Sequence, residues 1–288
     1  MDKKIIESRL QEHLSEAMGN ENISDWFVIA SNGSMNYGLD NDDSDIDSKL
    51  LTVPSLKKLI ENKRDNTTYF MKDNWEHVEV KDVALYMNTI LKQNINFVET
   101  LFAKAVIVNP RYKNDWEMLY ENRELIARYD TKRAVKCMYG MMVQKRKDME
   151  TWTEARAKSF HEFGYDTKSF HHLVRLHYFL QHYIVDGWSY EDCLTKRDDA
   201  EYKMLMDTKS GNILPASLTE AKSSVGSIRA SALADEYLLE SQRVADKYID
   251  ETDVSDIELS NRWDIKGLID LVVYGIVEHN VARSVYFM

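Results

Sequence analysis

The stretch Ile29-Ala-Ser-Asn-Gly-Ser-Met-Asn-Tyr-Gly-Leu-Asp-Asn-Asp-Asp-Ser-Asp-Ile-Asp47 decides how this chain of 288 residues is interpreted. It begins inside the apolar run Trp26 to Ala30, which is typical of a buried strand that ends in a turn. The turn contains Gly33-Ser34, where backbone N–H groups can bind phosphate oxygens because glycine has no side chain to block their approach. The Ser34 hydroxyl adds a further donor. The bend is therefore a candidate phosphate site.

Two carboxylates close the same stretch at strand spacing. Residues 48–53 read as a second apolar strand, and residues i and i+2 of a strand point to the same face. We therefore expect Asp45 and Asp47 to converge on one face while Ile46 points into the core. Two such carboxylates beside a phosphate suit hard divalent cations, so the pattern predicts a Mg²⁺ site that could also take Mn²⁺.

A third carboxylate is expected from a neighbouring strand, because two-metal phosphoryl transfer uses bridging acids. Residues 75–80 alternate in a way that indicates such a strand, and Glu79 stands between two valines in it. We predict Glu79 as the third ligand, with Glu76 and Asp82 as alternatives.

An acidic loop has simpler interpretations. Aspartate favours turns and caps, so an isolated Asp-x-Asp carries little information. An EF-hand loop that starts at Asp40 is excluded, because its sixth position is Asp45 instead of glycine and its twelfth is Leu51 instead of glutamate. The ordered set is more specific than either: apolar strand, Gly-Ser, spacer, Ser-Asp-x-Asp, second strand and a later isolated acid.

The order Gly33-Ser34, Tyr37-Gly38-Leu39 and Ser44-Asp45-Ile46-Asp47 resembles the signature of the DNA polymerase β-like nucleotidyltransferase superfamily. Two later segments, 91–102 and 164–176, are similar to blocks of the nucleotidyltransferases associated with RNA repair. Together the resemblance covers residues 27–190. Many relatives carry arginine after Gly-Ser, where this chain has Met35, and this departure puts a phosphate contact from that position in doubt.

The resemblance implies an α+β fold, with a small mixed sheet and helices followed by an all-helical domain. It implies metal binding by Asp45 and Asp47 and triphosphate binding by Gly33 and Ser34. After Tyr129, apolar residues recur at helical spacing almost without interruption. We therefore expect a nucleotidyltransferase domain over residues 1–125 and a helical domain over residues 126–288.

Composition excludes several other classes of protein. The net charge is −11 with 44% apolar and 30% charged residues, which is ordinary for a globular protein and excludes wholesale disorder. Two cysteines without CxxC spacing exclude a cysteine zinc site or a disulfide scaffold. We expect a cytoplasmic protein, because the charged N-terminus does not resemble a signal peptide and no stretch is typical of a membrane span.

One basic segment stands out in this acidic chain. Residues 131–175 hold ten Lys or Arg and five Asp or Glu, a local charge of +5. Such a segment favours contact with a polyanion, although a solvated helix face with mixed charge has the same composition. Lys168, His172 and Arg175 fall at i, i+4 and i+7 and are predicted to share one helix face that binds phosphates. A surface with ion pairs is the alternative.

These patterns predict transfer of an NMP from an NTP to an acceptor hydroxyl. The basic segment 131–175 and the resemblance favour an RNA acceptor, such as a tRNA end. The same chemistry on a protein or a small molecule, and a non-catalytic nucleotide-binding module, remain open. The sequence indicates neither the preferred NTP nor the oligomeric state.

Overall fold

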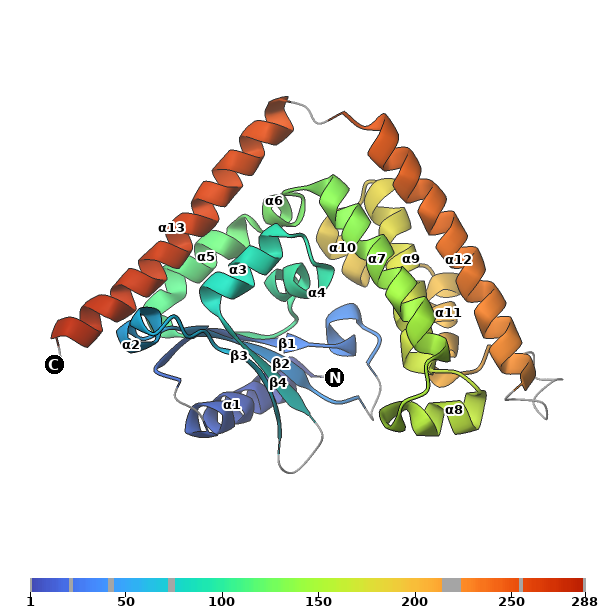
Figure 1. The fold of residues 1–288 in the computed structure, drawn as a ribbon, viewed down its shortest axis with the longest axis horizontal. Helices are drawn as coiled ribbons and strands as arrows, with labels where there is room; N and C mark the ends of the chain where they lie inside the picture. Colours follow the sequence, from blue (N-terminus) through green and yellow to red (C-terminus); the bar gives the residue numbers. More distant parts are fainter. Residues whose placement is uncertain are drawn as a thin grey trace. The chain divides into compact units, whose positions relative to one another are not determined.

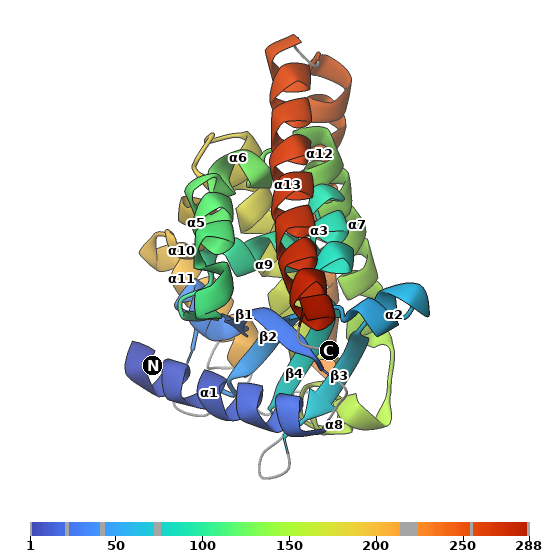
Figure 2. The same cartoon turned by 90° about the vertical axis from the view of Figure 1, so that its left-hand side faces the viewer.

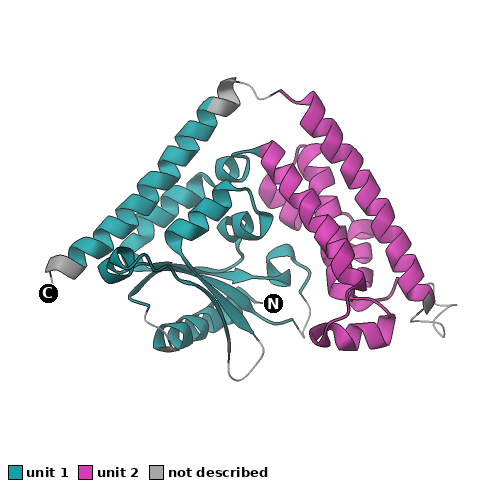
Figure 3. Cartoon of the chain, viewed as in Figure 1, with its two compact units in different colours: residues 1–130, 254–288 teal, residues 131–253 magenta. Residues whose placement is uncertain are grey.

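The computed structural model describes residues 2–20, 23–40, 44–71, 76–213, 224–253 and 256–286. The chain forms two compact units, residues 1–130 with 254–288 and residues 131–253 (Figure 3). The first unit contains a mixed sheet with helices, and the described part of the second contains helices alone. The expected α+β fold is confirmed.

A five-stranded sheet lies at the centre of the first unit, in the order β3-β4-β2-β1-β5. Its strands are β1 (Asp25–Asn32), β2 (Asp47–Val53), β3 (Asn66–Phe70), β4 (His77–Asp82) and β5 (Val106–Val108). β2 and β4 run parallel, and the other neighbours run antiparallel. The sequence indicated β1, β2 and β4, whereas the edge strands β3 and β5 were not predicted. Trp75, the expected start of β4, lies outside the described residues.

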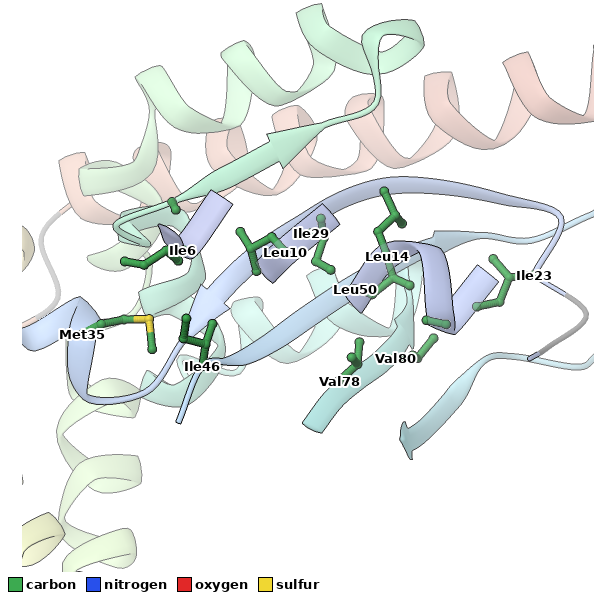
Figure 4. Close-up of a cluster of buried hydrophobic side chains, with 12 residues drawn as sticks. Ile6, Leu10, Leu14, Ile23, Ile29, Met35, Ile46, Leu50, Val78 and Val80 are labelled. Atoms are coloured by element: carbon green, nitrogen blue, oxygen red, sulfur yellow. The ribbon is translucent and has the colours of Figure 1, made fainter. Parts of the chain in front are cut away.

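Helix α1 (Lys3–Asn20) covers one face of this sheet (Figures 1 and 2). It does so because Ile6 and Leu10, at helical spacing and fully buried, pack into one cluster with side chains of the sheet. Figure 4 shows the labelled members of this cluster, which include Ile29, Ile46 and Leu50. Since strand residues alternate between faces, the side chains of Asp47 and Lys49 belong to the face away from α1.

The opposite face carries α3 (Val83–Leu91), α5 (Lys113–Glu121) and α13 (Asp256–Tyr286) (Figure 1). The side chain of Asp82 caps α3 by accepting from the N–H groups of Ala84 and Leu85 at 2.8 and 3.3 Å. The short elements of this unit are η1 (Ser34–Tyr37), α2 (Leu56–Ile60), α4 (Ile95–Val98), η2 (Glu99–Phe102), η3 (Pro110–Tyr112) and α6 (Arg123–Ala127).

The C-terminal helix corrects the expected domain division. Residues 254–288 were assigned to the helical domain, but α13 packs against α5, α3 and β2 of the first unit. Its buried side chains Ile265, Ile269, Val272 and Ile276 form one stripe along the helix. Asn280 donates to the carbonyl of Pro54 at 3.1 Å and fixes the far end. The first boundary between the two units along the chain lies between residues 130 and 131, whereas the sequence placed it between residues 125 and 126.

The second unit is a helical bundle built around α9 (Thr167–Ile184). Helices α7 (Thr131–Glu150), α10 (Tyr190–Thr195), α11 (Asp199–Ser210) and α12 (Ser224–Glu251) pack against it. The shorter η4 (Glu154–Arg156) and α8 (Ala157–Phe163) connect α7 to α9. Because α9 has neighbours on several sides, some of its polar residues, such as His171, Arg175 and His177, are buried as well as its apolar ones. No helix in the described ranges has the length and apolar character needed to cross a bilayer.

Candidate functional site

The bend after β1 depends on glycine. Gly33 has φ +105° and ψ −163°, a combination that is essentially restricted to glycine. No atom lies within 4 Å of a Cβ built there, so the requirement comes from the backbone and not from space. Ser34 follows as the first residue of η1, and the N–H groups that open such a turn have no acceptor within it.

Asn36 anchors the bend to the core. The Oδ1 of its buried side chain accepts from the Ser31 hydroxyl, and its Nδ2 donates to the Ser31 carbonyl, both at 2.8 Å. Its Oδ1 also accepts from the N–H of Lys104 at 3.0 Å. Met35, beside it, is 1% exposed and belongs to the cluster under α1. Met35 is therefore a core residue, in keeping with its departure from the phosphate-binding arginine.

The two aspartates lie next to this bend. Asn32, the last residue of β1, is the register partner of Asp47, the first residue of β2. The Ser34 hydroxyl lies 3.4 Å from the Ser44 hydroxyl, so the bend also approaches the segment before Asp45. Ile46 is buried as expected, whereas Asp45 is exposed and Asp47 is half-buried. In the described part of the chain, Asp45 takes part in no hydrogen bond or ion pair.

His77 is a contact that sequence reasoning missed. It lies opposite Asp47 in the parallel β2–β4 pair, with Nδ1 2.7 Å from Asp47 Oδ1. The backbone N–H of His77 donates to the same oxygen at 3.1 Å. One oxygen of Asp47 is thus fixed by β4. The sequence offered no signal for this pair, because it depends on the register of two strands that are distant along the chain.

Glu79 shares the sheet face of Asp47 but is bound elsewhere. It is the register partner of Lys49, and its two oxygens lie 3.7 Å from Lys49 Nζ and 3.6 Å from Lys81 Nζ. Both ammonium groups lie over the ring of Phe97, at 4.5 and 4.2 Å from its centroid. Lys49 is 2% exposed, and this burial lowers the pKa of its ammonium group although Glu99 and Glu79 favour the charged form.

The two alternative third carboxylates, Glu76 and Asp82, are bound to other groups. Glu76 binds Arg9 and His13 of α1, on the face opposite Asp47. Asp82 caps α3, pairs with Arg64 at 3.3 Å and lies at the far end of β4, where its register partner is Thr52. Within the described residues, no three His, Cys, Asp or Glu side chains gather as a metal site. Glu79 as third ligand therefore stays a prediction.

The three phosphate-binding candidates of the second unit do not form an exposed stripe. Lys168 is exposed, His172 is partly buried and Arg175 is 7% exposed. Burial, together with the positive charge of Arg175, holds the pKa of His172 well below its ordinary value, so this imidazole is neutral at pH 7. The difference arises because α9 is surrounded by other helices, so a single face is not left to solvent.

The basic segment 131–175 is partly neutralised within the unit. Arg146 binds Glu150 and Asp235 at 2.7 Å each, and Arg156 lies 3.4 and 3.5 Å from Asp148 and Asp166. Four exposed lysines have no ion pair in the described part of the chain: Lys136, Lys147, Lys158 and Lys168. Trp152, in the segment that follows α7, is 63% exposed.

Comparisons with known proteins assign this chain to no family. It matches neither a model of a protein family nor a curated protein. Among solved structures, it is similar to a nucleotidyltransferase-like protein from Exiguobacterium sibiricum, at 12% sequence identity and a TM-score of 0.30. The similarity covers 94% of this chain and 91% of that chain. We therefore argue the function from the residues of this chain.

Proposed function

We propose that this chain is a metal-dependent nucleotidyltransferase that moves an NMP from an NTP to an acceptor hydroxyl, with RNA as the favoured acceptor. One observation carries the proposal: the Gly33-Ser34 bend at the end of β1 lies beside Asp47 at the start of β2. This places a turn that can bind phosphate next to the aspartates, where β1 ends and β2 begins, and such an arrangement suits a metal–triphosphate complex.

The residues at this edge fit a divalent cation. Asp45 and Asp47 offer hard oxygen ligands, and Asp45 is exposed and has no hydrogen bond within the described residues. Asp47 has one oxygen fixed by His77, and among the described residues its second oxygen has no hydrogen bond, so that oxygen can take a ligand. Mg²⁺ commonly takes one or two carboxylates and completes its shell with phosphate oxygens and water. Mg²⁺, or Mn²⁺ in its place, therefore suits Asp45 and Asp47.

In the proposed reaction, the acceptor oxygen bonds to the α-phosphorus, the bond to the bridging oxygen of pyrophosphate breaks, and the hydroxyl proton passes to water. Bound Mg²⁺ would supply positive charge to the phosphate oxygens and favour deprotonation of the acceptor hydroxyl. The N–H groups at Gly33 and Ser34 bind the leaving pyrophosphate. The protein contributes positioning and charge and forms no covalent intermediate. The use of two ions, and Glu79 as their third carboxylate, stay predictions.

An RNA acceptor is supported by the second unit. Lys136 and Lys147 are eleven residues apart on α7, which is close to three helical turns and places them on one face. Lys158 and the exposed Trp152 belong to the segment that follows α7. Exposed lysines attract phosphates, and an exposed indole can stack on an unpaired base. Lys168 extends this charge, whereas the neutral His172 does not.

The experiment is labelling with each α-³²P-NTP in turn, in the presence of Mg²⁺, with total RNA and in parallel with total protein and small metabolites. We expect label in the RNA pool and its loss in Asp45→Asn and Asp47→Asn. Asp250→Asn, which changes an equally exposed aspartate on α12, is the matched control and should label like the unchanged chain.

Each alternative has its own result in the same experiment. Label in protein or in a small molecule would replace RNA as the acceptor. NTP binding without label in any pool would leave a non-catalytic nucleotide-binding module. Label that survives in both aspartate variants would overturn the assignment of the site.

A further inference from the structure

Glu76 lies at the centre of a buried network beneath the aspartates. Glu76 is 7% exposed and lies just before β4. Its Oε2 accepts from Arg9 Nε at 3.0 Å and from Arg9 Nη2 at 2.5 Å, and lies 3.0 Å from His13 Nε2. Arg9 and His13 are both on α1, so this carboxylate fastens the helix to the sheet.

The other oxygen of Glu76 reaches the acidic segment itself. Oε1 accepts from the backbone N–H of Ile46 at 3.0 Å, and Ile46 is the residue between Asp45 and Asp47. A backbone N–H in an exposed loop would bind water. The N–H of Ile46, just before the first residue of β2, instead donates to a buried carboxylate. Glu76 therefore fixes the backbone at the point where both aspartates emerge.

His13 holds the other side of Asp47. A carboxylate only accepts hydrogen bonds, so Nε2 of His13 carries the proton that faces Glu76, and Nδ1 accepts from the Ser48 hydroxyl at 2.9 Å. Burial keeps the pKa of His13 below its ordinary value although Glu76 favours protonation, in keeping with a neutral ring. The residues on both sides of Asp47, Ile46 and Ser48, are thus tied to one network.

We propose that Glu76, with His13, is a positioning residue that holds Asp45 and Asp47 in the arrangement that binds the divalent cation. This inference rests on the proposed function. Glu76 acts through the Ile46 amide and, by way of His13, through Ser48. Groups that orient metal ligands commonly change metal affinity by roughly 10- to 100-fold when they are replaced.

The test is Mn²⁺ binding, measured by electron paramagnetic resonance with the metal alone, on the full chain and on four variants. Glu76→Gln keeps the shape of the side chain but loses the charge that holds Arg9 and His13. We expect Mn²⁺ to bind on the order of tenfold more weakly to this variant, with an unchanged circular dichroism spectrum. Glu12→Gln is the matched control, because Glu12 is another acid bound to Arg9 but is exposed and has no contact with Ile46. It should bind Mn²⁺ like the unchanged chain.

Ser48→Ala is a second test of the positioning role, and it applies even if Glu76→Gln does not fold. It removes only the hydroxyl that His13 contacts, and should weaken Mn²⁺ binding in the same direction. Folded Glu76→Gln or Ser48→Ala with unchanged affinity would overturn the positioning role. Asp47→Asn separates failure of the metal site from failure of the positioning role. If Asp47→Asn binds Mn²⁺ as tightly as the unchanged chain does, or if neither protein binds Mn²⁺, the proposed metal site fails, and the positioning role fails with it.

Discussion

Lys49 and Glu79 face each other across the parallel strands β2 and β4, with Nζ of the lysine 3.7 Å from Oε2 of the glutamate. The ammonium is buried and also donates to the carbonyl of Asn96. Glu79 is thus, with Glu99, one of two carboxylates that compensate a buried charge next to the candidate site. Its neighbour Lys81 engages the second oxygen.

This pairing predicts an order among the acidic variants. Asp47→Asn removes a proposed ligand and should weaken Mn²⁺ binding by more than about tenfold, whereas Glu79→Gln, at the predicted third ligand that Lys49 and Lys81 also hold, should weaken it by a smaller factor of about three to ten. Isothermal titration with Mn²⁺ measures both. A Glu79→Gln variant that binds Mn²⁺ like the unchanged chain would exclude Glu79 as the third ligand.

Gly33 gives a prediction about stability that is independent of the reaction. Gly33→Ala forces an L side chain into φ +105° and should lower the free energy of unfolding by about 1–3 kcal/mol, measured by urea denaturation. Gly140→Ala is the matched control, because Gly140 lies inside α7, also has no atom within 4 Å of a built Cβ and has no positive φ. That control should be neutral or stabilising by up to about 1 kcal/mol. Equal effects of the two changes would contradict the assigned backbone strain.

The exposed lysines of the second unit give a prediction about RNA. The triple change Lys136, Lys147 and Lys158→Gln should make the salt dependence of single-stranded RNA binding shallower by about 2 in the logarithmic slope, since each neutralised phosphate contributes about 0.7. Filter binding between 50 and 200 mM salt, roughly the range over which such contacts weaken, measures the slope. Lys63, Lys92 and Lys113→Gln, all exposed in the first unit, form the control. An unchanged slope in the first triple variant would exclude this surface.

His177 predicts how the second unit responds to acid. Burial lowers the pKa of His177 to about 4, although a hydrogen bond with Tyr237 opposes the shift. In the unfolded chain the ordinary pKa applies, so the unfolded state binds the proton first as the pH falls. The stability that depends on a neutral His177 is fully present above pH 6.5. It is lost as the pH falls towards 4, and the total loss is about 3 kcal/mol.

Urea denaturation at pH 7 and pH 4.5 tests this sign. His177→Gln should reduce the loss of stability between the two values, since the glutamine does not titrate. His161→Gln, at an exposed histidine of α8, should leave the loss unchanged. The groups nearest His177 include Ser241, at 2.9 Å from Nδ1, and Glu240, at 3.8 Å from Nε2. A loss that is the same in all three proteins would assign the acid sensitivity to other groups.

Local patterns predicted the parts of the fold that depend on neighbours in sequence. Alternation indicated that Ile46 is buried between two outward aspartates, and its side chain is indeed buried. The helical spacing after Tyr129 was equally visible, but this spacing does not say what a given helix packs against. The return of α13 to the first unit is decided by packing against α5 and β2, and this sequence alone does not reveal it.

The candidate site divides in the same way. Gly33 and the two aspartates lie in one short segment, where spacing fixes their relation. The contacts of His77 with Asp47 and of Glu76 with Ile46 join residues about 30 positions apart, and they depend on strand register. The burial of Arg175 likewise follows from the helices around α9 and not from its spacing.

The most direct measurement is an anomalous-difference map from crystals grown with Mn²⁺ and an NTP whose α,β-bridging oxygen is replaced by a methylene group. We expect a manganese peak bound by oxygens of both Asp45 and Asp47, with the triphosphate against the N–H groups of Gly33 and Ser34. A fully bound nucleotide with no manganese at either aspartate, or a triphosphate seated away from this bend, would contradict the metal site on which the proposed activity depends.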